Sequence, residues 1–391
     1  MTHPRFRNST EIEKFAQTYA RDLADGHARH SLHPDTVARL GSVLSKAFDI
    51  TTMRAGHQQA VEDDFLDLLT ARTGETYPRS RTRFLYSASV AIDVMAKFFR
   101  GDHGTKLGVI TPTFDNIPAL LQMSCDNVLP IPEARLLPRA DLDYLDHSGV
   151  NALLIVNPNN PTGRHLARNE LCELLNWAAT RRVVVVFDLS FRMLEETTCL
   201  PVLDLADEVG APVATIDDTG KVISMHDTKV SVLSFSEALA PRLTEIVSQY
   251  LLNVSAVNIA LLSAALDSTA SGHDEVAAAR ALARSNRQHL RARLSEIPLP
   301  ASPFCLSGEA SGPGASMSVE WLNFAELADP LLAACRSRGL ELLPGNSFFW
   351  ESHKTPAESR DWIRVALLRD PHQFHSACDA LIDALVGLRP A

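Results

Sequence analysis

Lys221 has the side chain with the most demanding chemistry in this chain. It ends the acidic sequence Ile216-Asp217-Asp218-Thr219-Gly220-Lys221, which comes soon after the apolar run Ala211–Ala214. A lysine amine can form a covalent adduct with a carbonyl group and, once displaced, can move protons at the neighbouring carbon. The alternative is a surface charge in a short acidic turn at the end of a strand, so the interpretation depends on the residues that accompany it.

Two polar residues upstream also follow apolar runs. Asp188 comes directly after Val183–Phe187, and a carboxylate at the end of a buried strand requires a cationic partner because an unpaired buried ion is strongly destabilising. Asn160 lies in Asn157-Pro158-Asn159-Asn160-Pro161-Thr162-Gly163-Arg164, which begins where the run Ala152–Val156 ends. Open α/β sheets bind ligands at the carboxyl ends of their strands, so we expect both residues in one site. A turn with two prolines is the alternative for the asparagine motif.

A candidate anion site lies earlier in the chain. Ser87-Ala88-Ser89 opens a helix that we expect over Val90–Phe99. Small hydroxyl residues at a helix N-terminus bind phosphate through free backbone N–H groups and the helix dipole. An ordinary helix cap uses the same residue types, so this motif alone is weak evidence.

Short apolar runs that alternate with helical patterns must position these residues. The predicted strands are Leu107–Ile110, Asn127–Ile131, Ala152–Val156, Val183–Phe187, Val213–Ile216 and Val230–Leu233. Because these runs are apolar throughout, they fit a mostly parallel sheet that helices cover on both faces, which is a three-layer α/β/α domain.

The segments on either side of this domain have other patterns. Glu11–Asp22 has a helical pattern within a polar arm, and Asp274–Leu294 predicts a long helix that leads to a smaller α/β domain. We predict three parts: an N-terminal arm over residues 1–40, a large domain over 41–285 and a small C-terminal domain over 286–391.

The asparagine, the aspartate, the lysine and the Ser87-Ala88-Ser89 cup, taken together, resemble the fold-type I pyridoxal 5'-phosphate (PLP) enzymes, specifically the aminotransferase class I/II superfamily. This resemblance implies their fold, with PLP as the cofactor. It implies that Lys221 carries PLP as a Schiff base, that Asp188 keeps the pyridine nitrogen protonated, and that Asn160 binds the ring hydroxyl. The cup of Ser87, Ala88 and Ser89 would hold the phosphate.

Two more residues match this superfamily by their register. Phe114, in Thr111-Pro112-Thr113-Phe114-Asp115-Asn116, matches the aromatic side chain that stacks on the pyridine ring. Arg364, in Trp362-Ile363-Arg364-Val365-Ala366, matches the arginine that binds the substrate α-carboxylate with two parallel hydrogen bonds. A core aromatic and a surface arginine are the alternatives for these two residues.

Several positions depart from the superfamily pattern. Asp218 stands three residues before Lys221 where a serine is usual, and Lys229 replaces the usual phosphate-binding arginine. Phe191 replaces the tyrosine that binds the ring hydroxyl, with Ser190 beside it as a cofactor contact. An aspartate near the phosphate would be repelled unless it faces elsewhere, and a cationic substrate side chain would explain its presence.

Six motifs together resemble one branch of the superfamily: the PLP- and O2-dependent L-arginine oxidases and 4-hydroxylases of guanidino-amino-acid antibiotic biosynthesis. The motifs are Asp25-Gly26-His27-Ala28-Arg29 in the arm, Thr113-Phe114-Asp115-Asn116-Ile117, Asn159-Asn160-Pro161-Thr162-Gly163-Arg164, Ser190-Phe191-Arg192, Asp217-Asp218-Thr219-Gly220-Lys221 and Leu252-Asn253-Val254-Ser255. The resemblance implies that Thr10, Glu13 and Asp218 hold the substrate guanidinium, with Asp25 and His27 above the cofactor. For Thr10 and Glu13, a helix cap with acidic residues in its first turn is an open alternative.

The implied reaction converts L-arginine and O2 to 4-hydroxy-2-oxo-5-guanidinopentanoate, with some non-hydroxylated 2-oxo acid, and ammonia; His27 would assist the addition of water. A conventional aminotransferase for a cationic amino acid is the main alternative. A ligand-sensing or structural module without turnover is the third, and the retained catalytic residue types weaken it. The superfamily resemblance also implies a homodimer.

Composition limits the other partners. The formal charge of −10, without a block of basic residues, argues against nucleic acid and anionic membranes. Six scattered cysteines show no metal-ligand spacing and suggest reduced thiols, so no metal site is predicted. Neither a basic and apolar leader nor an apolar run of membrane-spanning length occurs, and we expect a cytoplasmic protein.

Overall fold

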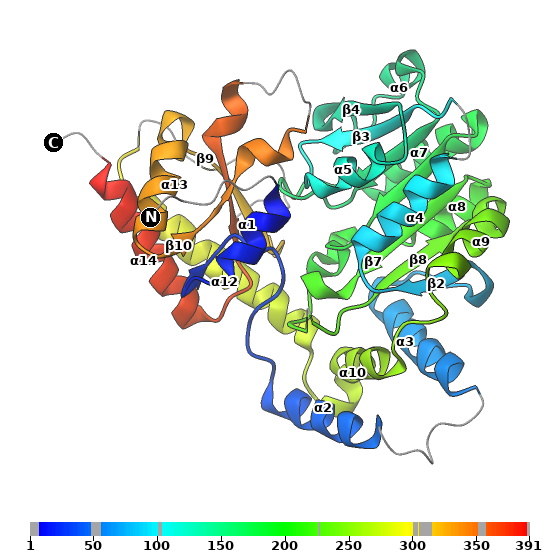
Figure 1. Cartoon of the computed structure of the whole chain (residues 1–391), viewed down its shortest axis with the longest axis horizontal. Coiled ribbons are helices and arrows are strands. Elements are labelled where there is room, and N and C mark those ends of the chain that lie inside the picture. Colours follow the sequence, from blue (N-terminus) through cyan, green and yellow to red (C-terminus); the bar gives the residue numbers. More distant parts are fainter. Residues whose placement is uncertain are drawn as a thin grey trace.

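The structure is a computed structural model that describes residues 8–47, 56–100, 104–225, 227–299, 304, 315–350 and 357–388. Figure 1 shows a larger body with a seven-stranded sheet and a smaller body that contains α13 and α14, with the N-terminal helix α1 between them. The candidate site residues come from both bodies and from this N-terminal segment.

The large sheet has the strand order β2-β8-β7-β6-β5-β3-β4. Only β8 runs antiparallel to its neighbours, and the other pairs are parallel. Strands β3 and β5 are buried at every position, as expected for strands with both faces covered. The strands are β2 Thr82–Leu85, β3 Leu107–Thr111, β4 Val128–Pro132, β5 Ala152–Val156, β6 Val184–Asp188, β7 Val213–Asp218 and β8 Ser231–Phe235.

Helices cover both faces of this sheet. Helix α5 connects β3 to β4 in one direction across the sheet, whereas α7 and α8 connect β5 to β6 and β6 to β7 in the opposite direction. Parallel crossovers are right-handed, so α5 lies on the opposite face from α7 and α8. The helices of this body are α3 His57–Thr73, α4 Ala88–Arg100, α5 Asn116–Gln122, α6 Leu142–Ser148, α7 Arg168–Arg181, α8 Val202–Val209, α9 Ala240–Tyr250, α10 Ala256–Leu266 and α11 Ser268–Ser271. The predicted three-layer α/β fold with a mostly parallel sheet is confirmed.

Helix α12, Glu275–Ser295, connects the two bodies. Its first half packs Val276, Ala279 and Ala283 into a core shared with α3 and α10, and its second half packs Leu290 and Leu294 into the core of the small body. The predicted domain boundary at residue 285 falls inside this helix and stays a prediction.

The small body is built on the antiparallel sheet β11-β12-β9. Its central strand β12 carries Arg364, which lies opposite Leu343 and Trp321. Its elements are β9 Val319–Asn323, α13 Ala328–Ser337, β10 Leu340–Glu341, β11 Leu343–Pro344, β12 Trp362–Ala366 and α14 Pro371–Gly387.

The N-terminal segment consists of α1 Ser9–Ala16, the short strand β1 Arg21–Asp22 and α2 Pro34–Ala47. The predicted helix over Glu11–Asp22 is wrong in its second half, because Arg21 and Asp22 pair in parallel with Leu340 and Glu341 of the small body. This long-range pairing overrides a helical pattern that is only local.

The six predicted strands agree with the structure to within two residues at every end, and Ala152–Val156 agrees at both ends. Strand β2 was not predicted. The interpretation of Ile216–Lys221 as an acidic turn is wrong for its first half. Strand β7 continues through Asp218, and only Thr219–Lys221 forms a 3-10 turn. Pairing of Asp217 and Asp218 with Val232 and Ser231 of β8 extends the strand.

In the part of the chain described, no helix is both long and apolar enough to cross a membrane. The same residues contain no cluster of three or more metal-ligating side chains. The five described cysteines are free thiols, and Cys305 lies outside the described residues.

Candidate active site

A cavity lies beyond the carboxyl ends of β3, β5 and β6, where crossovers leave the sheet in opposite directions. This is the expected ligand crevice of an open α/β sheet. All predicted site residues except Asp25 and Arg364 line it: Thr10, Glu13, His27, Ser87, Ala88, Ser89, Phe114, Asn160, Asp188, Ser190, Asp218, Lys221 and Lys229. Asp25 and Arg364 contact this lining directly, so the fold brings the whole predicted set together.

Asp188 ends β6 at the floor of the cavity and is only 6% exposed. Its Oδ1 accepts hydrogen bonds from the Ser190 hydroxyl at 2.5 Å and from the Ser190 backbone N–H at 3.0 Å. Burial raises the pKa of Asp188 to about 6, although the Ser190 bonds oppose this shift. A carboxylate desolvated to this degree is stabilised as an anion only by a cationic group in the cavity.

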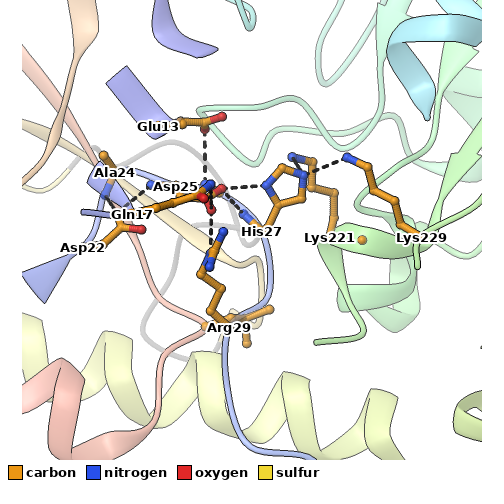
Figure 2. Close-up of polar contacts among 12 residues, drawn as sticks. Glu13, Gln17, Asp22, Ala24, Asp25, His27, Arg29, Lys221 and Lys229 are labelled. Atoms are coloured by element: carbon orange, nitrogen blue, oxygen red, sulfur yellow. Dashed lines mark hydrogen bonds and ion pairs between the residues drawn. The ribbon is translucent and has the colours of Figure 1, made fainter. Parts of the chain in front are cut away.

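His27 bridges the N-terminal segment and the two lysines, as Figure 2 shows. Its Nδ1 lies 2.6 Å from Asp25 Oδ1, while its Nε2 lies 3.0 Å from Lys229 Nζ and 3.4 Å from Lys221 Nζ. The Lys221 charge and then burial lower the pKa of His27, although Asp25 opposes them. A neutral imidazole that donates from Nδ1 to Asp25 therefore presents Nε2 to the cavity as a proton acceptor.

The pKa of Asp25 itself is lowered. Burial raises it, but the hydrogen bond and charge of His27, together with the charges of Lys221 and Arg369, outweigh the burial. Asp25 also accepts a hydrogen bond at 2.6 Å from Nε of Arg29. Asp25 is thus a fixed anion that orients the imidazole ring.

The Ser87-Ala88-Ser89 cup forms the N-terminus of α4, and Asp218 points directly at it. Ala88 N–H donates to Asp218 Oδ2 at 3.0 Å, and Gly220 N–H donates to Asp218 Oδ1 at 2.8 Å. In this structure Asp218 therefore faces the α4 N-terminus, where the superfamily resemblance places the phosphate. A helix N-terminus carries free N–H groups and a positive dipole end, so it attracts the Asp218 carboxylate.

Lys229 lies beside this cup. A Cβ on Gly220 would come within 2.8 Å of Lys229 Cδ, so only glycine lets the lysine side chain pass. Burial lowers the pKa of Lys229, while the Asp218 charge opposes the shift. The cavity therefore offers an anion one helix N-terminus and one ammonium group.

Arg364 lies next to the cavity lining and is 1% exposed on β12. Its Nη2 donates to Glu13 Oε1 and to the Ala24 carbonyl, both at 2.6 Å, and its Nη1 donates to Asn160 Oδ1 at 3.3 Å. Its Cζ lies 5.8 Å from the ring centroid of Phe114. Arginine, asparagine and aromatic residue thus meet as predicted, but a carboxylate of the chain already occupies the guanidinium.

Helix α1 places Glu13 inside the molecule. Asn8 caps the helix by accepting a hydrogen bond from Glu11 N–H at 2.9 Å. The helix cap and its first-turn acid are therefore Asn8 and Glu11, and not Thr10 and Glu13. Glu13 is 6% exposed and also accepts from Gly26 N–H at 3.2 Å. Thr10 lines the cavity from the same helix.

Arg369 was not among the predicted site residues. This buried side chain donates to three backbone carbonyls of the N-terminal segment: to Asp25 at 2.6 Å, to Asp22 at 2.9 Å and to His27 at 3.0 Å. An arginine directly after the apolar sequence Val365-Ala366-Leu367-Leu368 was the available signal, because such a residue needs buried acceptors. Arg369 holds Asp25 and His27 over the cavity.

The donor set fits PLP. A phosphate suits the α4 N-terminus and Lys229, a protonated ring nitrogen would neutralise the buried Asp188, and the Lys221 amine would bind the aldehyde. That Asp218 already occupies the α4 N-terminus shows that this position favours an anion. Fold and site together define a fold-type I PLP-dependent enzyme.

Comparison with known proteins supports this assignment to the fold-type I PLP-dependent enzymes. The chain belongs to the aminotransferase class I and II family, whose model matches residues 44–381. It is similar in structure to MppP, which was solved after soaking with the product 2-ketoarginine: TM-score 0.82 and 27% identity over 93% of this chain and 99% of that one.

Two aminotransferase structures show the same fold. LysN, the α-aminoadipate aminotransferase from Thermus thermophilus, has a TM-score of 0.76 and 16% identity over 96% of this chain and 95% of that one. N-succinyldiaminopimelate aminotransferase from Mycobacterium tuberculosis has a TM-score of 0.75 and 19% identity over 96% of both chains. No curated protein sequence matches this chain.

Proposed function

We propose that this enzyme is a PLP-dependent L-arginine oxidase and 4-hydroxylase that uses O2. Its products would be 4-hydroxy-2-oxo-5-guanidinopentanoate, some non-hydroxylated 2-oxo acid, and ammonia. The observation that carries the proposal is a set of carboxylates at one cavity. Glu13 and Asp218 line the cavity, and Asp25 contacts His27, which also lines it. The similarity to MppP, which was soaked with the product 2-ketoarginine, supports a substrate with the arginine side chain.

Binding of arginine would rearrange one ion pair. Arg364 holds Glu13 at 2.6 Å, so a substrate carboxylate must replace Glu13 on the guanidinium. Released Glu13 would then face the substrate guanidinium together with Asp218 and Thr10. An amino acid without a cationic side chain would leave Glu13 buried and unpaired, which is unfavourable. This exchange favours a cationic amino acid.

The proposed chemistry distributes proton transfers among three side chains. PLP, when bound, supplies the electron sink that acidifies the substrate Cα proton. Lys221 would take that proton, Asp188 would keep the ring nitrogen protonated, and His27 Nε2 would remove a proton from the water that adds at the 4-position. Electrons balance if each two-electron oxidation of the substrate reduces one O2 to hydrogen peroxide.

The experiment is incubation of the purified, PLP-loaded protein with L-arginine alone in air. Oxygen consumption, ammonia release and a 4-hydroxylated 2-oxo acid by mass spectrometry are the expected results. Lysine serves as the matched cationic control with a different head group. No oxygen uptake, but amino transfer after a 2-oxo acid is added, would leave the conventional aminotransferase, which membership of the aminotransferase class I and II family favours.

We also propose that the enzyme is a cytoplasmic homodimer without nucleic-acid or membrane partners. The exposed large apolar side chains of the larger body include Tyr86 at 46%, Tyr250 at 38% and Leu252 at 99%. Burial of such side chains against a second copy would be favourable.

A further inference from the structure

Four buried polar side chains, Glu75, Tyr77, Arg192 and Asp217, form a cluster that does not line the cavity. Arg192 is fully buried, and the other three members are at most 4% exposed. The Arg192 guanidinium donates from Nε to Asp217 Oδ1 and from Nη2 to Asp217 Oδ2, both at 2.8 Å. We call these four residues the Arg192 cluster.

The other two members close the network. Arg192 Nη1 donates to Glu75 Oε2 at 2.7 Å, and Arg192 Nη2 contacts the Tyr77 hydroxyl. The Tyr77 hydroxyl also donates to Asp217 Oδ2 at 3.2 Å. Each partner therefore restricts the guanidinium to one plane and one position.

The cluster joins the segment after β6 to the end of β7, close in sequence to the proposed cofactor contacts Asp188 and Lys221. Arg192 follows Asp188 by four residues in the loop after β6, and Asp217 precedes Lys221 by four residues at the end of β7. Strands β6 and β7 are neighbours, with Asp188 paired to Ile216. The two parallel hydrogen bonds of the Arg192–Asp217 pair thus connect the segment that follows Asp188 to the segment that precedes Lys221.

Stability alone does not account for such a cluster. A buried ion pair is often no more stabilising than well-packed apolar side chains of similar volume, whereas it specifies one geometry. Burial raises the pKa of both Glu75 and Asp217, although Arg192 opposes the shift at each. Desolvated groups of this kind suit a rigid spacer better than a source of stability.

We propose that Arg192 and Asp217 are positioning residues that set the separation and orientation of Asp188 and Lys221, and so hold the two ends of the cofactor ring system in register. The proposal rests on the proposed binding of PLP by these two residues. Neither Arg192 nor Asp217 lines the cavity, so both act through their neighbours.

The test is Arg192→Lys, which keeps the positive charge but loses the planar fork. If Asp188 and Lys221 move apart, Asp188 stabilises the proton on the ring nitrogen less well. We expect the pH midpoint of the visible absorbance of the bound cofactor to shift by about half a unit or more, which is about threefold in the proton equilibrium. The turnover number should fall about tenfold or more, with little change in KM for arginine, since a misplacement of about 1 Å is enough for such a loss.

Arg287→Lys is the matched control. Arg287 is 1% exposed on α12, where it pairs with Glu320 at 2.6 Å and donates to the carbonyls of Ala315, Met317 and Val319. Its replacement should lower thermal stability to a similar degree without moving the absorbance midpoint. If the two variants lose the same thermal stability and have the same pH midpoint of visible absorbance, Arg192 has a structural role only, and the proposal is overturned.

Tyr77→Phe is the second variant if Arg192→Lys does not fold. It removes only the hydroxyl that contacts Arg192 and Asp217, so we expect a smaller shift of the midpoint in the same direction, and no shift would count against the proposal. Wild-type protein is titrated with PLP first. Absence of visible absorbance there would refute PLP binding, and with it this inference, whereas a shifted midpoint in a protein that does not oxidise arginine would refute only the proposed reaction.

Discussion

Replacement of Asp218 by asparagine should change the affinities for cofactor and substrate in opposite directions. In the structure the Asp218 carboxylate accepts the Ala88 N–H at 3.0 Å, at the helix terminus where the PLP phosphate would bind. Phosphate binding therefore requires Asp218 to leave, after which its charge would be available to the substrate guanidinium. A neutral asparagine side chain would release the helix N-terminus more easily but would attract a guanidinium less.

The magnitude follows from the contacts that are exchanged. A negative charge at a helix N-terminus is worth about 0.3–1 kcal/mol, and up to about 2 kcal/mol when partly buried. Asp218 is 3% exposed, so the upper part of this range applies. Loss of about 1–2 kcal/mol from the competing contact corresponds to about 5- to 30-fold tighter PLP binding. Loss of a charged partner for the guanidinium, about 1.5–3 kcal/mol, should raise KM for arginine by about tenfold or more.

The assay is titration of cofactor-free protein with PLP, followed by visible absorbance, and then steady-state kinetics with arginine. Asp93→Asn is the control, because Asp93 lies on α4, where its carboxylate is 2.8 Å from Lys97 Nζ. This replacement also removes one negative charge, but outside the Ser87-Ala88-Ser89 cup. Unchanged or weaker PLP binding by Asp218→Asn, with Asp93→Asn unaffected, would refute the reasoning that Asp218 and phosphate compete for one site.

Four further outcomes are expected. His27→Ala should shift the products from the hydroxylated to the simple 2-oxo acid, and mass spectrometry showing an unchanged ratio would remove the role of Nε2 as a base. Arg369→Met should release the segment around Asp25 from its three carbonyl contacts, so limited proteolysis before residue 30 should become at least about tenfold faster; a wild-type cleavage rate would contradict this. Leu252→Asp should weaken self-association of the proposed dimer, and sedimentation that shows the same dimer at all concentrations would place the interface elsewhere. In the cofactor-free protein, Asp188 binds its proton more tightly when folded, with a pKa raised from 3.8 to about 6, so the stability that it contributes is present below about pH 4 and is lost as pH rises through 6. Chemical denaturation should show that the free energy of unfolding of the wild type falls by about 3 kcal/mol across this pH range. The Asp188→Asn variant should lack this fall.

Local sequence determined the large sheet and the residues at its carboxyl edge. The runs that end before Asn157 and at Phe187 are apolar throughout because helices cover both faces of the strands. Parallel strands end at one edge, so polar residues directly after such runs had to meet there. Asn160, Asp188 and Lys221 were predictable for this reason, and their spacing identified the family.

Tertiary structure alone decided which charges face each other. Glu13 meets Arg364 across 351 positions of sequence, and Arg192 meets Glu75 across 117. The direction of Asp218 depended on where the α4 N-terminus lies, and the end of α1 depended on the pairing of Arg21 with Leu340. Local periodicity reports only which face of an element is buried, whereas ion pairs and helix-terminus contacts depend on how separate elements pack, so these features could be seen only in the folded chain.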